Sequence, residues 1–164
     1  MKPEFSNKIE QLYLEMYDML FTYASNAFQE ESLAEEAVQE TFHTACRKAE
    51  RLCSSQNPKG WLVQTLKFTI QNMRRSRENA RQLLSDYLVD QQEKWAASED
   101  NLDLLLLYED LSRSEEFRLV KELAINGRSL PEMAQDRGIS VSACKKRVQR
   151  AKEVLRKKMN RDTL

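Results

Sequence analysis

Apolar residues recur at steps of three and four residues through most of this chain, and this spacing places them on one face of an α-helix. Residues 5–28, 33–52 and 61–81 carry the pattern, and it returns in shorter pieces after residue 102. Residues that interrupt helices are scarce, because the 164 residues include only three glycines and three prolines. The sequence therefore predicts an all-α fold.

The helical pattern weakens in the middle of the chain. Residues 86–101 are acidic, rich in Gln and Ser, and poorly periodic. Such a composition is typical of a tether between domains. We therefore predict two small helical domains, at residues 1–82 and 102–164, joined by a flexible acidic linker at 83–101.

Several local signals predict where the helices begin and end. Ser32, with Glu35 three residues later, has the spacing of a capping box that starts a helix. Residues 53–60 are rich in Ser, Asn, Pro and Gly, and we expect a loop there. The last two helices are predicted at about 129–137 and 140–159.

The formal net charge is zero, but the charges are gathered in blocks of alternating sign. The sums are −7 over residues 1–46, +7 over 47–81, −8 over 82–117 and +8 over 118–164. Like charges in a block repel one another, so such blocks call for a partner. Two basic blocks indicate two places that hold a polyanion, and chance clustering on solvated helix faces remains the alternative.

Residues 130–158 have the pattern of a helix-turn-helix. Ala134 is small where the two helices would cross, and Gly138 permits the positive φ of a sharp turn. Ile139 would fill the core, and Ser140 would cap the next helix. These four residues fall in the register that the motif needs.

The last predicted helix has two faces. The inward face is apolar and consists of Val141, Cys144, Val148, Ala151 and Leu155. The outward face is polar and consists of Ser142, Lys145, Lys146, Gln149 and Lys152, flanked by Arg147 and Arg150. Residues 144–161 hold nine bases and one acid. A helix of this kind suits the major groove of DNA; the alternative is an ordinary helical hairpin with a basic solvated face.

Segments in both halves are similar to one protein family. The segment L-P-E-M-A-Q-D-R-G-I-S-V at 130–141 and the basic helix after it resemble the promoter-reading C-terminal domain of extracytoplasmic-function sigma factors. The segment A-E-E-A-V-Q-E-T-F-H-T-A at 34–45 resembles the part of those proteins that grips the polymerase clamp helices. The segment N-P-K-G-W-L at 57–62 and the basic helix end at 72–75 follow at the family's usual intervals. The similar segments of the two halves occur in the same order along this chain as in the family.

The resemblance implies a role for four groups of residues. The face that meets the polymerase clamp helices would consist of Glu35, Glu36, Gln39 and Glu40. The loop that captures a flipped base of the −10 element would use Ser54, Ser55, Gln56 and Asn57. The phosphates of the −10 element would be held by Lys67, Arg74, Arg75 and Arg77. The −35 element would be read by Ser142, Lys145, Lys146, Arg147, Gln149 and Arg150. A solvated acidic helix and a plain Ser/Asn turn are the alternatives for the first two groups.

The chain also departs from the family's pattern. Cys144 stands where an aliphatic residue is usual, and Lys146 where a small polar residue is common, which puts the family's usual promoter sequence in doubt. We find no aromatic cluster beside the basic stretch of the first domain. Trp61 belongs to the apolar stripe of its helix and is expected in the core rather than on a base-stacking surface.

The resemblance also implies partners and a location. The partners are core RNA polymerase, through its clamp helices and flap, promoter DNA, and an anti-sigma factor. No run of apolar residues is long enough to span a membrane, so we expect no membrane insertion and a cytoplasmic protein.

Catalytic and metal chemistry are not expected. The chain has one histidine and no nucleophile triad or phosphate-binding glycine loop, so we expect no enzyme activity and no cofactor. His43, Cys46 and Cys53 lack a fourth ligand for a metal site.

Two other functions remain open from the sequence. A DNA-binding regulator that acts without joining polymerase would need a sensing or dimerisation domain in residues 1–80. A helical adaptor with no role on DNA would leave the two basic blocks unexplained.

Overall fold

The computed structural model of this chain describes residues 1–96 and 109–160, and in these parts it contains helices and turns only. The all-α prediction is confirmed for them. The chain divides into two compact units, Met1–Arg75 and Ser76–Leu164. Each unit is described by itself below.

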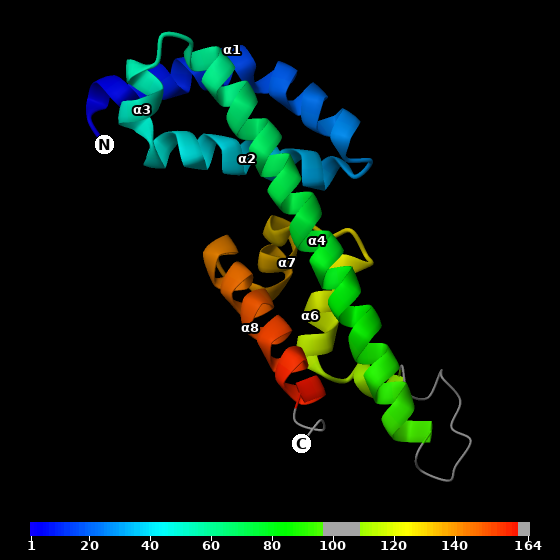
Figure 1. The fold of residues 1–164 in the computed structure, drawn as a ribbon. Coiled ribbons are helices and arrows are strands. Elements are labelled where there is room, and N and C mark those ends of the chain that lie inside the picture. The colour runs from blue at the N-terminus through cyan, green and yellow to red at the C-terminus, as the bar shows by residue number, and fades with distance from the viewer. Residues whose placement is uncertain (97–108, 161–164) are drawn as a thin grey trace. The chain divides into compact units, whose positions relative to one another are not determined.

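The first unit is built from three helices and the beginning of a fourth (Figure 1). They are α1 (Pro3–Ala27), α2 (Glu31–Arg47), α3 (Ala49–Ser54) and α4 (Pro58–Ala96), of which residues 58–75 belong to this unit. The apolar faces of these helices form one core, which includes Leu12, Met16, Leu20, Val38, Phe42, Leu62 and Leu66. The pattern of the sequence predicts this core, because each helix buries its apolar stripe.

Two predicted boundaries in the first unit are wrong. Ser32 does not cap α2, because the helix begins at Glu31 and the Glu30 carbonyl already accepts from the backbone N–H groups of Leu33 and Ala34. The loop predicted at 53–60 is shorter, since only residues 55–57 lie between α3 and α4.

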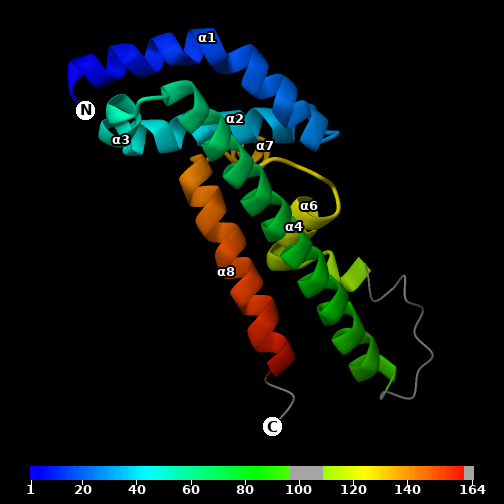
Figure 2. The same cartoon turned by 45° about the horizontal axis from the view of Figure 1, so that its top comes forward.

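The second unit combines the rest of α4 with α6 (Glu115–Ala124), α7 (Leu130–Arg137) and α8 (Val141–Asn160) (Figure 2). Its core includes Ala80, Leu84, Tyr87, Phe117, Val120, Met133, Cys144, Val148 and Leu155. The predicted positions of the last two helices are confirmed to within one residue at each end.

Part of the predicted linker is helical. We predicted a flexible linker at 83–101, but residues 83–96 continue helix α4. Leu83, Leu84 and Tyr87 are buried there, so this stretch contributes to a core. The acidic residues and glutamines lie on the solvent side of the helix. They outnumber the three buried apolar residues, so the sequence pattern of this stretch did not predict a helix. Residues 97–101 lie outside the described residues.

Candidate nucleic-acid interface

The turn before α8 is fixed by local hydrogen bonds. Ser129 and Glu132 form a capping box at the start of α7, with the Glu132 backbone N–H donating to the Ser129 hydroxyl over 3.3 Å. Gly138 then ends α7 with φ of 62°, a left-handed conformation that favours glycine. Ser140 caps α8, because its hydroxyl oxygen accepts from the Ala143 backbone N–H over 3.1 Å. The predicted roles of Gly138 and Ser140 are therefore confirmed.

An ion-pair cluster holds α7 against α6. The Arg137 guanidinium donates to both carboxylate oxygens of Glu122, each over 3.1 Å. This bidentate pairing raises the pKa of Arg137. Arg128, which lies in the turn between the two helices, is paired with Asp136 and Glu122. Because paired charges restrict the rotation of one helix on the other, this cluster orients the turn that presents α8.

Helix α8 has one buried and one exposed face. Cys144, Val148, Ala151 and Leu155 are buried, as the sequence predicts. All six predicted DNA-reading residues are exposed: Ser142, Lys145, Lys146, Arg147, Gln149 and Arg150. The helix therefore presents five cationic or amide groups and one hydroxyl to solvent along its first three turns.

Two residues of α8 lie on the opposite side from the one we predicted. Val141, predicted in the core, is 45% exposed. Lys152, predicted on the outward face, is only 6% exposed, and its ammonium donates to the Ser76 hydroxyl of α4 over 3.4 Å. The periodicity places these residues at the border of the two faces, so the segments that pack beside them decide their exposure.

The surroundings of Lys152 are cationic. Burial lowers the pKa of its ammonium group, and the positive charges of Arg156 and Arg77 lower it further. Within residues 1–96 and 109–160 no carboxylate forms an ion pair with Lys152. Burying an ammonium group that has one long hydrogen bond costs free energy of folding, because that bond replaces only part of the lost hydration.

The predicted polymerase-binding residues all lie on α2. Glu35 and Gln39 are exposed, while Glu36 and Glu40 are half-buried. The Glu40 carboxylate accepts from Arg47 over 3.3 Å and lies 3.6 Å from the ring of His43. The structure therefore brings the four residues onto one helix surface, with the charge of Glu40 partly neutralised by its neighbours.

The short loop at residues 55–57 uses part of its polar groups for its own structure. The Asn57 side-chain oxygen accepts from the Gly60 backbone N–H over 2.9 Å, which caps the start of α4. A Cβ atom on Gly60 would clash with the Asn57 amide, so a larger residue there would displace the side chain that forms this cap. The Ser55 hydroxyl accepts from the Asn57 N–H, and the Ser54 hydroxyl donates to the Arg51 carbonyl. Gln56 is exposed.

The four predicted phosphate-binding residues of α4 are not equivalent. Lys67, Arg74 and Arg75 belong to the first unit and are exposed. Arg74 also holds the end of α1, because its guanidinium donates to the Ala27 carbonyl over 2.7 Å and lies over the ring of Phe28. Of the three side chains, that of Arg75 contributes least to the packing and hydrogen bonding of the first unit.

Arg77 does not belong with the other three. It is only 8% exposed and lies in the second unit, where its guanidinium donates to the carbonyls of Leu123 and Arg128 over 2.9 and 3.1 Å. Arg81, one turn further on, donates to the Ala124 carbonyl over 2.7 Å. Both arginines therefore satisfy carbonyl groups at the C-terminal end of α6, where a positive charge is stabilising. The burial and these hydrogen bonds do not favour the phosphate contact that we predicted for Arg77.

Two aromatic residues near the basic stretch were missed in the sequence. Tyr23 of α1 is 43% exposed, and the Lys67 ammonium lies 6.0 Å from the centre of its ring. Phe68 is 56% exposed and follows Lys67 directly. Residue Phe68 could have been noticed, since it is a large apolar residue next to a lysine. Tyr23 gives no local signal, because it is 44 positions away from Lys67 along the chain.

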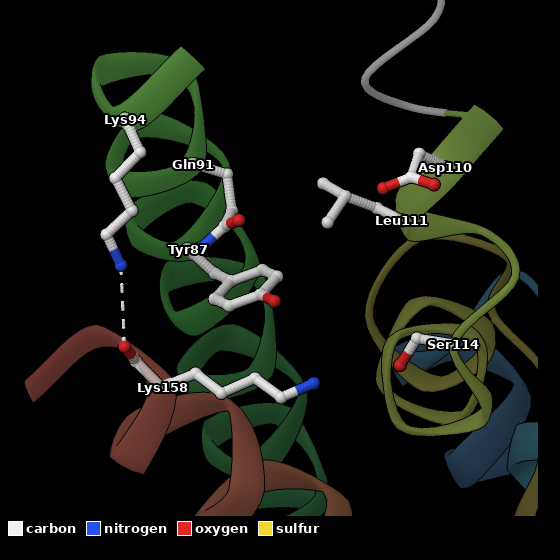
Figure 3. A pocket seen from close by; sticks show the side chains of 7 residues that line it. All are labelled: Tyr87, Gln91, Lys94, Asp110, Leu111, Ser114 and Lys158. Atoms are coloured by element: carbon white, nitrogen blue, oxygen red, sulfur yellow. Dashed lines mark hydrogen bonds between the residues drawn. The ribbon is translucent and has the colours of Figure 1, made fainter. Parts of the chain in front are cut away.

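A pocket of about 420 Å³ lies elsewhere in the second unit (Figure 3). Its lining consists of Tyr87, Gln91, Lys94, Asp110, Leu111, Ser114 and Lys158. Lys94 is paired with Asp90 over 2.8 Å and donates to the Lys158 carbonyl over 3.4 Å. The Ser114 hydroxyl caps α6. Because Lys94 and Ser114 already serve the fold, we do not take this pocket as a candidate ligand site.

One family model matches a segment in the first half of the chain. Residues 12–81 match the family model of sigma-70 region 2. No significant match was found among curated proteins or among solved structures. The matched segment runs from the first turns of α1 into the middle of α4 and contains three of the four groups of candidate residues.

This match connects residues 12–81 with transcription initiation, the process in which sigma factors act. Through residues 12–81 the chain carries a region 2 of the sigma-70 family. In the described parts of the chain, none of the helices has the length and apolar character that crossing a membrane requires.

Proposed function

We propose that this chain is an alternative sigma factor of the extracytoplasmic-function type, which binds core RNA polymerase and directs it to a particular set of promoters. The observation that supports this most is the order of two features. A region 2 of the sigma-70 family is followed by a capped basic helix, α8, whose exposed side carries lysines, arginines and amides.

In this proposal the surface of α2 binds the clamp helices of polymerase. Glu35 and Gln39 are the exposed members of that surface, and a carboxylate there suits a basic partner. The double substitution Gln39→Ala with Glu40→Lys should therefore weaken binding to core polymerase at least tenfold. A matched control is Glu10→Lys, which reverses an exposed charge on α1. Equal binding by the double variant and the control would remove the main reason for placing polymerase on α2.

The −10 element is assigned to the first unit. Lys67 and Arg75 are exposed there and would hold phosphates, while Gln56 and the amide of Asn57 would contact a flipped base. Arg74 would contribute with the part of its guanidinium that α1 leaves free. Arg77 has no place in this group.

The −35 element is assigned to α8. Helices of this kind place their N-terminal residues against base edges in the major groove, and Lys145 and Lys146 lie one turn from the capped end of α8. Replacing either lysine should cost about 1–3 kcal/mol at a base that it reads. A contact with phosphate alone would weaken all sequences alike and reduce the salt slope by about one unit.

A single pair of measurements tests the proposal. The purified chain is mixed with core RNA polymerase, and the complex is then assayed by run-off transcription on genomic fragments. We expect co-purification and transcription from a subset of fragments. A regulator acting without polymerase would bind DNA but not join the core enzyme, and a helical adaptor would do neither.

Two finer points belong to the proposal. Sigma factors of this type are held inactive by anti-sigma factors, and we infer such a partner here from the resemblance of the two halves to that type. The location that goes with this function is the cytoplasm.

A further inference from the structure

Val141 is an apolar residue in an exposed position. It is the first residue of α8, and 45% of it is accessible. Its position is fixed, because the Ser140 hydroxyl and carbonyl accept from the backbone N–H groups of Ala143 and Cys144 over 3.1 and 2.9 Å. The buried face of the helix begins one turn later, at Cys144, which is fully covered.

The neighbours of Val141 on the helix surface are polar or cationic. Lys145 follows four residues later, and at about 100° per residue the two side chains point within about 40° of each other. Ser142, the next residue, is exposed as well. A branched apolar side chain therefore stands at the N-terminal edge of the cationic face of α8.

We propose that Val141 contributes to sequence specificity by contacting the C5 methyl group of a thymine. The inference rests on the proposed function, in which α8 reads the −35 element. The N-terminal residues of a recognition helix approach the base edges most closely. In the major groove, thymine is distinguished by a methyl group, and an apolar side chain is the natural contact for it.

Among the described residues of the second unit, two other large apolar residues are exposed, and they lie on other segments. Val89 lies on α4 and is 53% exposed, and Ile125 follows the end of α6 and is 57% exposed. Neither belongs to α8. Val89 therefore provides a matched control, because it is an exposed valine on a helix of the same unit.

The experiment uses the full chain, alone and in complex with core RNA polymerase. Duplexes are selected from a random-sequence library, and each thymine of the selected site is then replaced singly by deoxyuridine, which lacks only the methyl group. Binding is measured for the unsubstituted chain, Val141→Ala and Val89→Ala. Circular dichroism and thermal unfolding verify that both variants are folded.

For one thymine, loss of the methyl group should weaken binding by the unsubstituted chain about fourfold, the factor that corresponds to one buried methyl group. The Val141→Ala variant should bind the thymine duplex less tightly by a similar factor and should no longer distinguish thymine from uracil at that position. The Val89→Ala variant should behave like the unsubstituted chain.

Two results would overturn the inference in different ways. If a sequence is selected but every uracil substitution affects the unsubstituted chain and Val141→Ala alike, the contact by Val141 is wrong while reading by α8 stands. If neither the chain nor its complex with polymerase selects any sequence, reading by α8 is wrong, and the inference fails together with that part of the proposed function.

Discussion

Replacing Lys152 by methionine should stabilise the protein. Only 6% of Lys152 is accessible, and the hydrogen bond from its ammonium to the Ser76 hydroxyl is 3.4 Å long. Arg77 and Arg156 add repulsion. Methionine has a similar length and no charge, so it keeps the packing while it removes the desolvation of the ammonium group.

The expected gain in the free energy of unfolding is about 1 kcal/mol, the low end of the range for a poorly satisfied buried polar group, because the bond to Ser76 is lost as well. For a domain of this size that gain raises the melting temperature by about 4–8 °C. The control is Lys145→Met, which removes an exposed lysine of the same helix and should change stability by less than about 0.5 kcal/mol.

The pH dependence gives a second, independent readout. The pKa of Lys152 is lower in the folded protein than its ordinary value of 10.5, so the unfolded chain binds more protons between the two pKa values. The free-energy cost of burying the charged ammonium is therefore complete at pH values below the pKa of Lys152 in the folded protein. The free energy of unfolding then increases as the pH rises toward 10.5. This rise should be present in the unsubstituted protein and absent in Lys152→Met.

Urea unfolding followed by circular dichroism at several pH values measures both effects. If Lys152→Met is no more stable than Lys145→Met and has the same pH slope as the unsubstituted protein, Lys152 is hydrated in solution. The account of a buried, unpaired ammonium would then be refuted.

Three further substitutions test the second unit. Gly138→Ala should cost about 1–2 kcal/mol in urea unfolding, because a Cβ meets no atom within 4 Å and only the left-handed backbone opposes it; a neutral result would mean that the turn adopts another conformation. Ser129→Ala should cost about 0.5–2 kcal/mol through loss of the α7 cap, and Ser129→Asp should restore most of it. Arg77→Ala should lower stability by about 1–3 kcal/mol, since the carbonyls of Leu123 and Arg128 lose their donor, whereas Arg75→Ala should leave stability unchanged. Equal stability of the two arginine variants would return Arg77 to the group of phosphate contacts.

The helices of this chain can be predicted from the sequence because their signals are local. The caps of α8 and the end of α7 depend on residues within four positions of one another, Ser140 with Ala143 and Gly138 with Ala134. The same local spacing predicts that Cys144 and Val148 are buried. The missed continuation of α4 through residue 96 has a different origin: its acidic residues and glutamines masked Leu84 and Tyr87, which are too few to form a strong stripe by themselves.

The candidate interface is only partly predictable. The exposure of Lys146 and Gln149 follows from periodicity, because they stand opposite the buried stripe. Arg77 has the same residue type as Arg74 and Arg75 and lies in the same basic run, and nothing in its neighbourhood along the chain distinguishes it. Its carbonyl partners are 46 and 51 positions away.

The sequence by itself determined that this chain is helical, where most of its helices begin, and which side of each helix is apolar, since these properties depend on residues one or two turns apart. Only the tertiary structure decided that Lys152 is covered, that Val141 is exposed and that Tyr23 lies beside Lys67. Periodicity specifies the direction of a side chain from its own helix axis. Burial depends on which distant segment packs over that direction, and that segment carries no local signal.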